Sequence, residues 1–179
     1  MYKDNSLIPS EAVRLAALGL LAKRPHAYAD LARDIRHFTA RLVGPSLDLL
    51  GPSLELLKVE GLIEAVDPAT PHDRQIVRIT PEGRAELYRL LTANLRGPMG
   101  EVNKLIVALK LYFLDQLEPD QRRQQLEMLM EVCDRELVRL NDLHSHHKES
   151  GSALIPWLEH EISEVQARRD WFLKLREAV

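Results

Sequence analysis

Lysine, arginine and histidine side chains in the first half of the chain have the chemistry and spacing to contact a nucleic acid. Residues 1–97 carry 13 Lys and Arg against 12 Asp and Glu, whereas residues 98–179 carry 11 against 15. The net charge of −3 gives no overall attraction to phosphate. Because cations must neutralise the phosphates of a nucleic acid, we expect any such contact in the first half.

Two other groups of reactive side chains point to simpler roles. His144 and His147 could share a helix face and bind a metal ion, but no cysteine lies near them, and a solvated helix end is the favoured interpretation. Cys133 occupies an apolar heptad position between acidic neighbours, which is typical of a small buried side chain. The sequence contains no phosphate-binding glycine loop, nucleophile elbow or H-E-x-x-H motif. We therefore expect neither an enzyme nor a metal or cofactor site.

The segment from Gly44 to Arg78 is the part of the chain that we most expect to touch DNA. Its pattern predicts a helix that stops at Gly61 in a left-handed conformation, then strands over residues 62–66 and 75–79 with a polar tip between them. This order is typical of a winged helix. The heptapeptides GPSLDLL and GPSLELL follow one another at 44–57, so the helix could begin near Pro45 or at Pro52.

Helical patterns surround this segment. Apolar spacing predicts helices over residues 10–21 and 27–39, followed by a connection at 40–43. Thr80-Pro81-Glu82 predicts the start of a further helix that runs to about Leu95. Arg96-Gly97-Pro98 ends that helix, which suggests a winged-helix domain over 1–97 and a helical domain over 98–179.

The apolar spacing in the second half predicts three long helices, whose apolar faces need other helices to cover them. Residues Leu126 to His144 repeat at heptad spacing, and an intrachain helix pair plus a second subunit would bury their faces. The candidate dimerisation residues are the apolar positions of these helices, namely Phe113, Leu126, Met130, Leu137, Leu140, Leu158, Ile162, Val165, Trp171 and Phe172.

Length and composition indicate an ordinary globular protein. The chain has 179 residues and one cysteine, and 45% of its residues are hydrophobic. No apolar run approaches the roughly 20 residues of a membrane span, and the first ten residues lack the apolar core of a signal peptide. We expect a cytoplasmic protein.

Five stretches carry a family resemblance: ALGLLAKRPHAYADLARDI, LELLKVEGLIE, RQIVRITPEGRAEL, KLYFLDQLEPDQRRQQL and EVQARRDWFLKL. On these stretches the chain resembles the PadR family of bacterial transcriptional regulators. In that family a proline within the recognition helix is usual, so the resemblance favours one helix from about Pro45 that bends at Pro52. The family usually has a tyrosine before this proline and basic residues after it, whereas this chain has Gly51 and Leu-Glu-Leu-Leu.

The resemblance implies a mainly α fold, with an N-terminal winged helix-turn-helix and a C-terminal antiparallel long-helix dimerisation domain. It implies a homodimeric repressor of a two-fold symmetric operator, released by a small aromatic or hydrophobic effector near Tyr112, Phe113, Met130, Trp157 and Trp171. The candidate DNA-binding residues lie on or near the helix and the wing, namely His26, Tyr28, Arg36, Arg41, Ser46, Ser53, Lys58, His72 and Arg74. Two alternatives stay open: a dimeric ligand-binding or protein-interaction module that has lost DNA recognition, and a MarR-like regulator.

Overall fold

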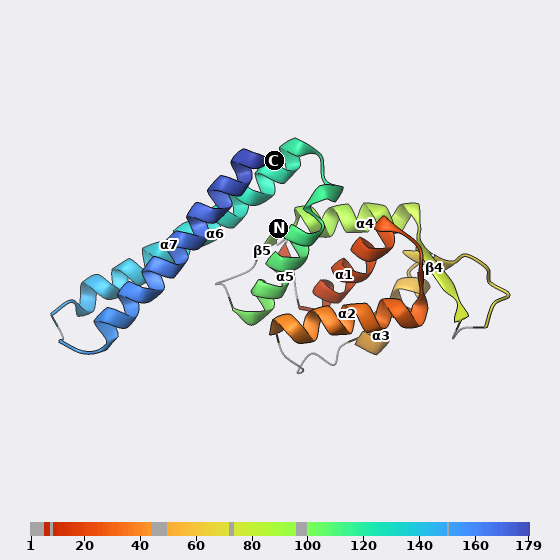
Figure 1. The fold of residues 1–179 in the computed structure, drawn as a ribbon, viewed down its shortest axis with the longest axis horizontal. Coiled ribbons are helices and arrows are strands. Elements are labelled where there is room, and N and C mark those ends of the chain that lie inside the picture. Colours follow the sequence, from red (N-terminus) through yellow and green to blue (C-terminus); the bar gives the residue numbers. More distant parts are fainter. Residues whose placement is uncertain (1–5, 8, 44–49, 72–73, 96–99, 150) are drawn as a thin grey trace, which may run out of the picture. The chain divides into compact units, whose positions relative to one another are not determined.

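The computed structural model describes residues 6–7, 9–43, 50–71, 74–95, 100–149 and 151–179, which form a mainly helical fold with short strands (Figure 1). The chain divides into two units, Met1–Leu117 and Glu118–Val179. Helix α5, Glu101–Tyr112, belongs to the first unit. The sequence instead predicts a winged-helix domain that ends at residue 97 and a helical domain that begins at residue 98. Within the described residues, no helix combines the length and the apolar character that crossing a membrane requires.

Helix α1, Pro9–Lys23, is the centre of the first unit. It contacts α2 (Tyr28–Val43), α3 (Leu50–Val59), α4 (Pro81–Thr92) and α5. Leu15, Ala17 and Leu18 are completely buried, because neighbours surround the helix on most sides. The other helices are therefore positioned against a shared apolar helix (Figure 1).

A three-stranded antiparallel sheet closes one end of this unit. Its order is β2 (His26–Ala27), β4 (Ile76–Ile79) and β3 (Ile63–Ala65), with His26 opposite Val77 and Ile63 opposite Ile79. The predicted hairpin is thus confirmed, and β2 is an addition that the sequence pattern did not reveal. A separate parallel pair joins β1 (Ser6–Leu7) to β5 (Asn94–Leu95).

Two predicted helix ends differ from the structure. Helix α2 continues to Val43, so the predicted connection at 40–43 is wrong; Leu42 lies beside Ala108 and Leu111 of α5 around a shallow depression, and this apolar surface favours a further helical turn. Helix α4 ends at Thr92 rather than near Leu95, because residues 94–95 pair with β1 instead.

The turns around α3 and α4 behave as the sequence predicts. Gly61 has φ of 71°, the left-handed conformation that glycine adopts at low cost, and it ends α3. Thr80 caps α4, since its hydroxyl oxygen accepts a hydrogen bond of 3.0 Å from the Gly83 amide. The same hydroxyl donates to the Gly61 carbonyl at 2.7 Å, so one side chain joins both turns.

The second unit is a hairpin of two long helices, α6 (Pro119–His147) and α7 (Leu154–Ala178). A 3-10 turn at Leu114–Gln116 ends the first unit, and Pro119 starts α6. Ion pairs from Arg169 to Asp134 and from Arg176 to Glu127 show that the two helices run antiparallel. The heptad pattern of α6 is therefore paired at least in part within the chain.

Candidate DNA-binding surface and adjoining cavity

A small polar network holds α2, α3 and the wing together. The Lys58 ammonium donates a 2.6 Å hydrogen bond to the Gln75 side-chain carbonyl and lies 5.2 Å from the centre of the Tyr28 ring. The Tyr28 amide donates to the Gln75 backbone carbonyl at 2.9 Å. Since these residues come from α3, the residue just before β4 and the start of α2, the network constrains the position of α3 relative to α2 and the wing.

Glu55 in α3 and Glu60 just after it have partners within the chain. Burial raises the pKa of Tyr28 well above its usual range, and a hydrogen bond to the Glu55 side chain raises it further. Tyr28 therefore stays protonated and donates to this carboxylate. Glu60, just beyond α3, pairs with Arg14 at 2.6 Å. The acidic character of the segment is thus partly neutralised by partners inside the first unit.

Other candidate DNA-binding residues are scattered over this unit. Arg36, Arg41 and Arg74 are exposed, and His26 is half-buried in β2. Ser46 and His72 lie outside the described residues, as does the expected helix start near Pro45; α3 is described from Leu50 onward. The structure describes the backbone of Ser53 but not its side chain. The DNA-contacting role of all these residues stays a prediction.

Among the described side chains of α3, the exposed apolar ones are Leu56 and Val59, with 47% and 83% of their surface accessible. They lie three residues apart and so share a face of the helix. This face therefore presents apolar surface rather than charge.

The candidate dimerisation residues are mostly buried in the single chain. Leu126, Met130, Leu158, Val165 and Phe172 are each at most 8% exposed. Phe113 lies in the first unit and is buried there; Leu137, Leu140 and Ile162 are half-buried, and Trp171 is half-exposed. Their role between subunits stays a prediction, because a buried side chain needs a rearrangement before it can contact a partner.

The large apolar side chains exposed on the described part of the hairpin are Val138, Leu143, Trp157 and Trp171, with 70%, 40%, 52% and 51% of their surface accessible. We call these four the hairpin patch. Arg168 and Arg169, which interrupt the apolar pattern of α7, pair with Glu136 and Asp134 of α6. These pairs help to fix the register of the hairpin.

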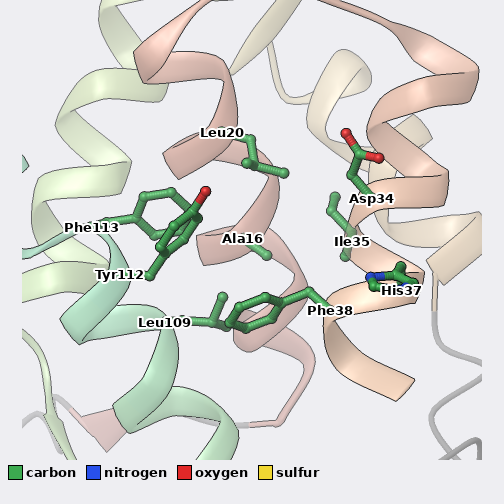
Figure 2. A pocket seen from close by; sticks show the side chains of 9 residues that line it. All are labelled: Ala16, Leu20, Asp34, Ile35, His37, Phe38, Leu109, Tyr112 and Phe113. Atoms are coloured by element: carbon green, nitrogen blue, oxygen red, sulfur yellow. The ribbon is translucent and has the colours of Figure 1, made fainter. Parts of the chain in front are cut away.

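A cavity of about 230 Å³ lies between α1, α2 and α5 (Figure 2). In the figure, Tyr112 and Phe113 lie on one side and Asp34 and His37 on the other. The full lining consists of Ala16, Leu20, Asp34, Ile35, His37, Phe38, Leu109, Tyr112 and Phe113. Two of the predicted effector-lining residues, Tyr112 and Phe113, are among them. The other three, Met130, Trp157 and Trp171, belong to the second unit and do not line it.

A shallower depression continues from this cavity along α2 and α5. His37, Phe38 and Tyr112 line both spaces, and Arg41 lines only the depression. Arg41 therefore faces an apolar surface between two helices. The charge of Arg41 predicted a phosphate contact, but nothing in the sequence pointed to this position between two helices.

Lys110 is a buried cation that the sequence interpretation missed. Only 1% of its surface is accessible, and its ammonium donates to the carbonyl oxygens of Leu91 at 2.6 Å and Ala93 at 2.7 Å. Burial lowers its pKa to about 7, while these carbonyls at the negative end of α4 favour the charged form. A lysine inside the apolar run IVALKLYF was the available signal.

Comparison with known proteins places these features in a family. The family of AphA-like transcriptional regulators matches residues 2–176. No curated protein sequence matches the chain significantly.

Several solved structures are similar to this chain at low sequence identity. PadR of Bacillus subtilis bound to operator DNA is 18% identical, with 93% of this chain and 98% of that chain covered and a TM-score of 0.39. The same protein bound to p-coumaric acid is also 18% identical, with coverage of 96% and 97% and a TM-score of 0.40. A PadR-like regulator of Bacillus cereus is 17% identical, with coverage of 92% and 94% and a TM-score of 0.41.

Proposed function

The chain belongs to the family of AphA-like transcriptional regulators, and from this premise we propose that it represses transcription by binding a two-fold symmetric operator as a homodimer. The supporting observation is the polar network that holds α3 against α2 and the wing. A reading helix must be presented at a fixed angle to enter the major groove. The contacts of Tyr28, Lys58 and Gln75 supply such a constraint.

Two regions of the first unit are proposed to contact DNA. The first half of α3, which includes Ser53, would enter the major groove, and the exposed Arg74, two residues before β4, would approach the backbone. Arg36 on α2 would add a phosphate contact. Tyr28 and Lys58 would act indirectly, because their side chains already bind Glu55 and Gln75.

The hairpin patch is proposed as part of the dimer interface. Exposed aromatic residues are enriched at protein interfaces, and the chain leaves two tryptophans half-exposed on this hairpin. Val138→Glu is expected to shift the protein from dimer to monomer in analytical ultracentrifugation. Val66→Glu, which places the same charge on a half-exposed valine of the first unit, is the matched control and is expected to leave the dimer intact.

DNA binding is tested by titrating the purified protein against the DNA upstream of its own gene and against random DNA. Fluorescence anisotropy at two salt concentrations gives the number of phosphate contacts from the salt dependence. Arg74→Ala is expected to weaken binding to all sequences and to reduce the salt slope by about 1. Arg84→Ala, an exposed arginine of α4, is the control and is expected to have no such effect.

A second candidate function is a ligand-binding or protein-interaction module that has lost DNA recognition. The exposed Leu56 and Val59 on α3 favour it, since an unpaired apolar helix face also suits a protein partner. Absence of binding at low salt, or equal affinity for random DNA, would refute the regulator and support this module. Where binding is specific, in vitro transcription separates repression from activation.

A further inference from the structure

A network of charged side chains joins the C-terminal end of α3 to α1 and α4. Its members alternate in charge, in the order Glu60, Arg14, Glu86, Arg89 and Glu11. Glu60 directly follows α3, two members belong to α1 and two belong to α4. Because opposite charges alternate, each inner member is attracted by both of its neighbours.

The contact between Arg14 and Glu60 uses both oxygens of the carboxylate. The Arg14 Nη1 atom lies 2.6 Å from Glu60 Oε2, and Arg14 Nη2 donates a 2.9 Å hydrogen bond to Glu60 Oε1. The Nη1 atom also lies 3.4 Å from Glu86 Oε1. The planar guanidinium group makes such a two-point contact directional, which a point charge does not. Arg14 therefore restrains where the end of α3 lies as well as neutralising its charge.

The position of Glu60 is unfavourable for an acid that has no partner. Carbonyl groups at the C-terminal end of a helix repel negative charge. The turn that follows is well defined, since Gly61 has φ of 71° and the Leu62 amide donates to the Leu57 carbonyl at 2.9 Å. The Thr80 hydroxyl binds the Gly61 carbonyl and ties this turn to the start of α4. The pair with α1 offsets the repulsion at Glu60 and holds the turn from a second side.

We propose that the Arg14–Glu60 pair is a clamp that fixes the C-terminal end of α3 against α1, and that both are positioning residues for DNA binding. The contacts of Tyr28 hold α3 at Glu55 and Lys58, against α2 and the wing. A helix held at one point can pivot, whereas a second point removes that freedom. The clamp itself does not depend on DNA, but its use in DNA binding rests on the function proposed above.

Glu60→Gln gives the sharpest test, because charge and position predict different results. Removal of an acid from a DNA-binding unit should leave binding equal or make it stronger if charge alone matters. Loss of the clamp should instead weaken it, because a smaller fraction of the protein then holds α3 in the binding position. We expect operator affinity in fluorescence anisotropy to fall at least about threefold. The salt slope should not change, because no phosphate contact is lost.

Arg14→Gln should weaken operator binding to a similar degree, again with an unchanged salt slope. The double variant of Arg14→Gln and Glu60→Gln should bind about as well as the single variants, because each single change already breaks the same contact. Glu11→Gln is the matched control, since it removes an acid from the opposite end of the same network, where its partner is Arg89. It is expected to change operator affinity less than about twofold.

Amide hydrogen exchange, followed by ¹H–¹⁵N NMR on the DNA-free protein, measures the clamp itself. In the Glu60→Gln and Arg14→Gln proteins, exchange at Gly61 and Leu62 should be at least about threefold faster relative to exchange at Ile35 of α2. The ratio to Ile35 removes the effect of a general loss of stability. In the Glu11→Gln protein the ratio should stay as in the wild type.

Unchanged or stronger operator binding by Glu60→Gln overturns the positioning role, as does a reduced salt slope in Arg14→Gln or an equal loss in the Glu11→Gln control. Unchanged exchange ratios at Gly61 and Leu62 overturn the clamp. If Arg14→Gln does not fold, Glu60→Gln, at a more exposed position, decides both questions. If the wild type binds no operator, the regulator falls and the exchange ratios still decide the clamp. If the wild type binds and Glu60→Gln binds equally well, the positioning role falls alone.

Discussion

Replacing Gly19 by alanine tests the packing of α1 against the end of α5. A Cβ atom at Gly19 would lie 2.4 to 2.5 Å from three atoms of the Phe113 ring, whereas ordinary contacts begin near 3.4 Å. The ring would have to retreat by roughly 1 Å, and Phe113 is completely buried. Overpacking of this kind costs about 1–3 kcal/mol.

Helix propensity opposes this clash. Gly19 lies inside α1, where alanine is favoured over glycine by about 1 kcal/mol. The net expectation for Gly19→Ala is therefore a loss of up to about 2 kcal/mol in the free energy of unfolding. In a Phe113→Leu background the ring is absent, so the same substitution should instead stabilise the protein by up to about 1 kcal/mol.

Urea denaturation of the wild type, both single variants and the double variant, followed by circular dichroism, gives the coupling energy. The expected result is a change of sign between the two backgrounds. Gly19→Ala that stabilises the wild type, or destabilises both backgrounds equally, would refute the idea that this glycine exists to accommodate the Phe113 ring.

Three further predictions concern other packed positions. A Cβ at Gly83 would lie 2.1 Å from the Leu62 carbonyl oxygen, so Gly83→Ala should lower the free energy of unfolding, measured by urea denaturation, by about 2–4 kcal/mol. Gly100 has open space around it, so the control Gly100→Ala should lower that free energy by less than about 1 kcal/mol. Because burial lowers the pKa of Lys110 from 10.5 to about 7, the unfolded chain binds more protons between these values. The wild type should therefore gain stability relative to Lys110→Met as pH rises from 7 to 9.5, by up to about 1 kcal/mol per pH unit. Thermal unfolding at several pH values measures this, and the same pH dependence of stability in both proteins would contradict it. Arg169→Gln removes the ion pair with Asp134 between α6 and α7. Because solvent screens this pair, the variant should melt at nearly the same temperature as the wild type, and a large drop in the melting temperature would indicate that the pair holds the hairpin together.

Local sequence signals predicted the turns of this fold well. Gly61 and Thr80 act within a few residues of their own positions, so the glycine stop and the threonine cap could be identified without knowing the tertiary fold. Strand β2 could not be identified in this way. It consists of two residues, and its partner in β4 lies about 50 positions further along the chain.

The heptad pattern of α6 was correctly identified as a surface that requires a helix, but the pattern does not say which helix. Leu126 and Met130 are buried within one chain, and the spacing alone fits a partner in α7 as well as one in another subunit. The same limit applies to the candidate DNA-binding residues. Charge suggested that Lys58 is available for phosphate, whereas its hydrogen bond to Gln75 depends on a contact across 17 positions.

The network of Tyr28, Glu55, Lys58 and Gln75 also limits how α3 can be exchanged between related proteins. A helix α3 taken from a related regulator would replace Glu55 and Lys58 while leaving Tyr28 and Gln75 without their present partners. Helix α3 therefore cannot be exchanged by itself without the loss of these contacts. An exchange that keeps them has to include the start of α2 and the residue before β4 together with α3.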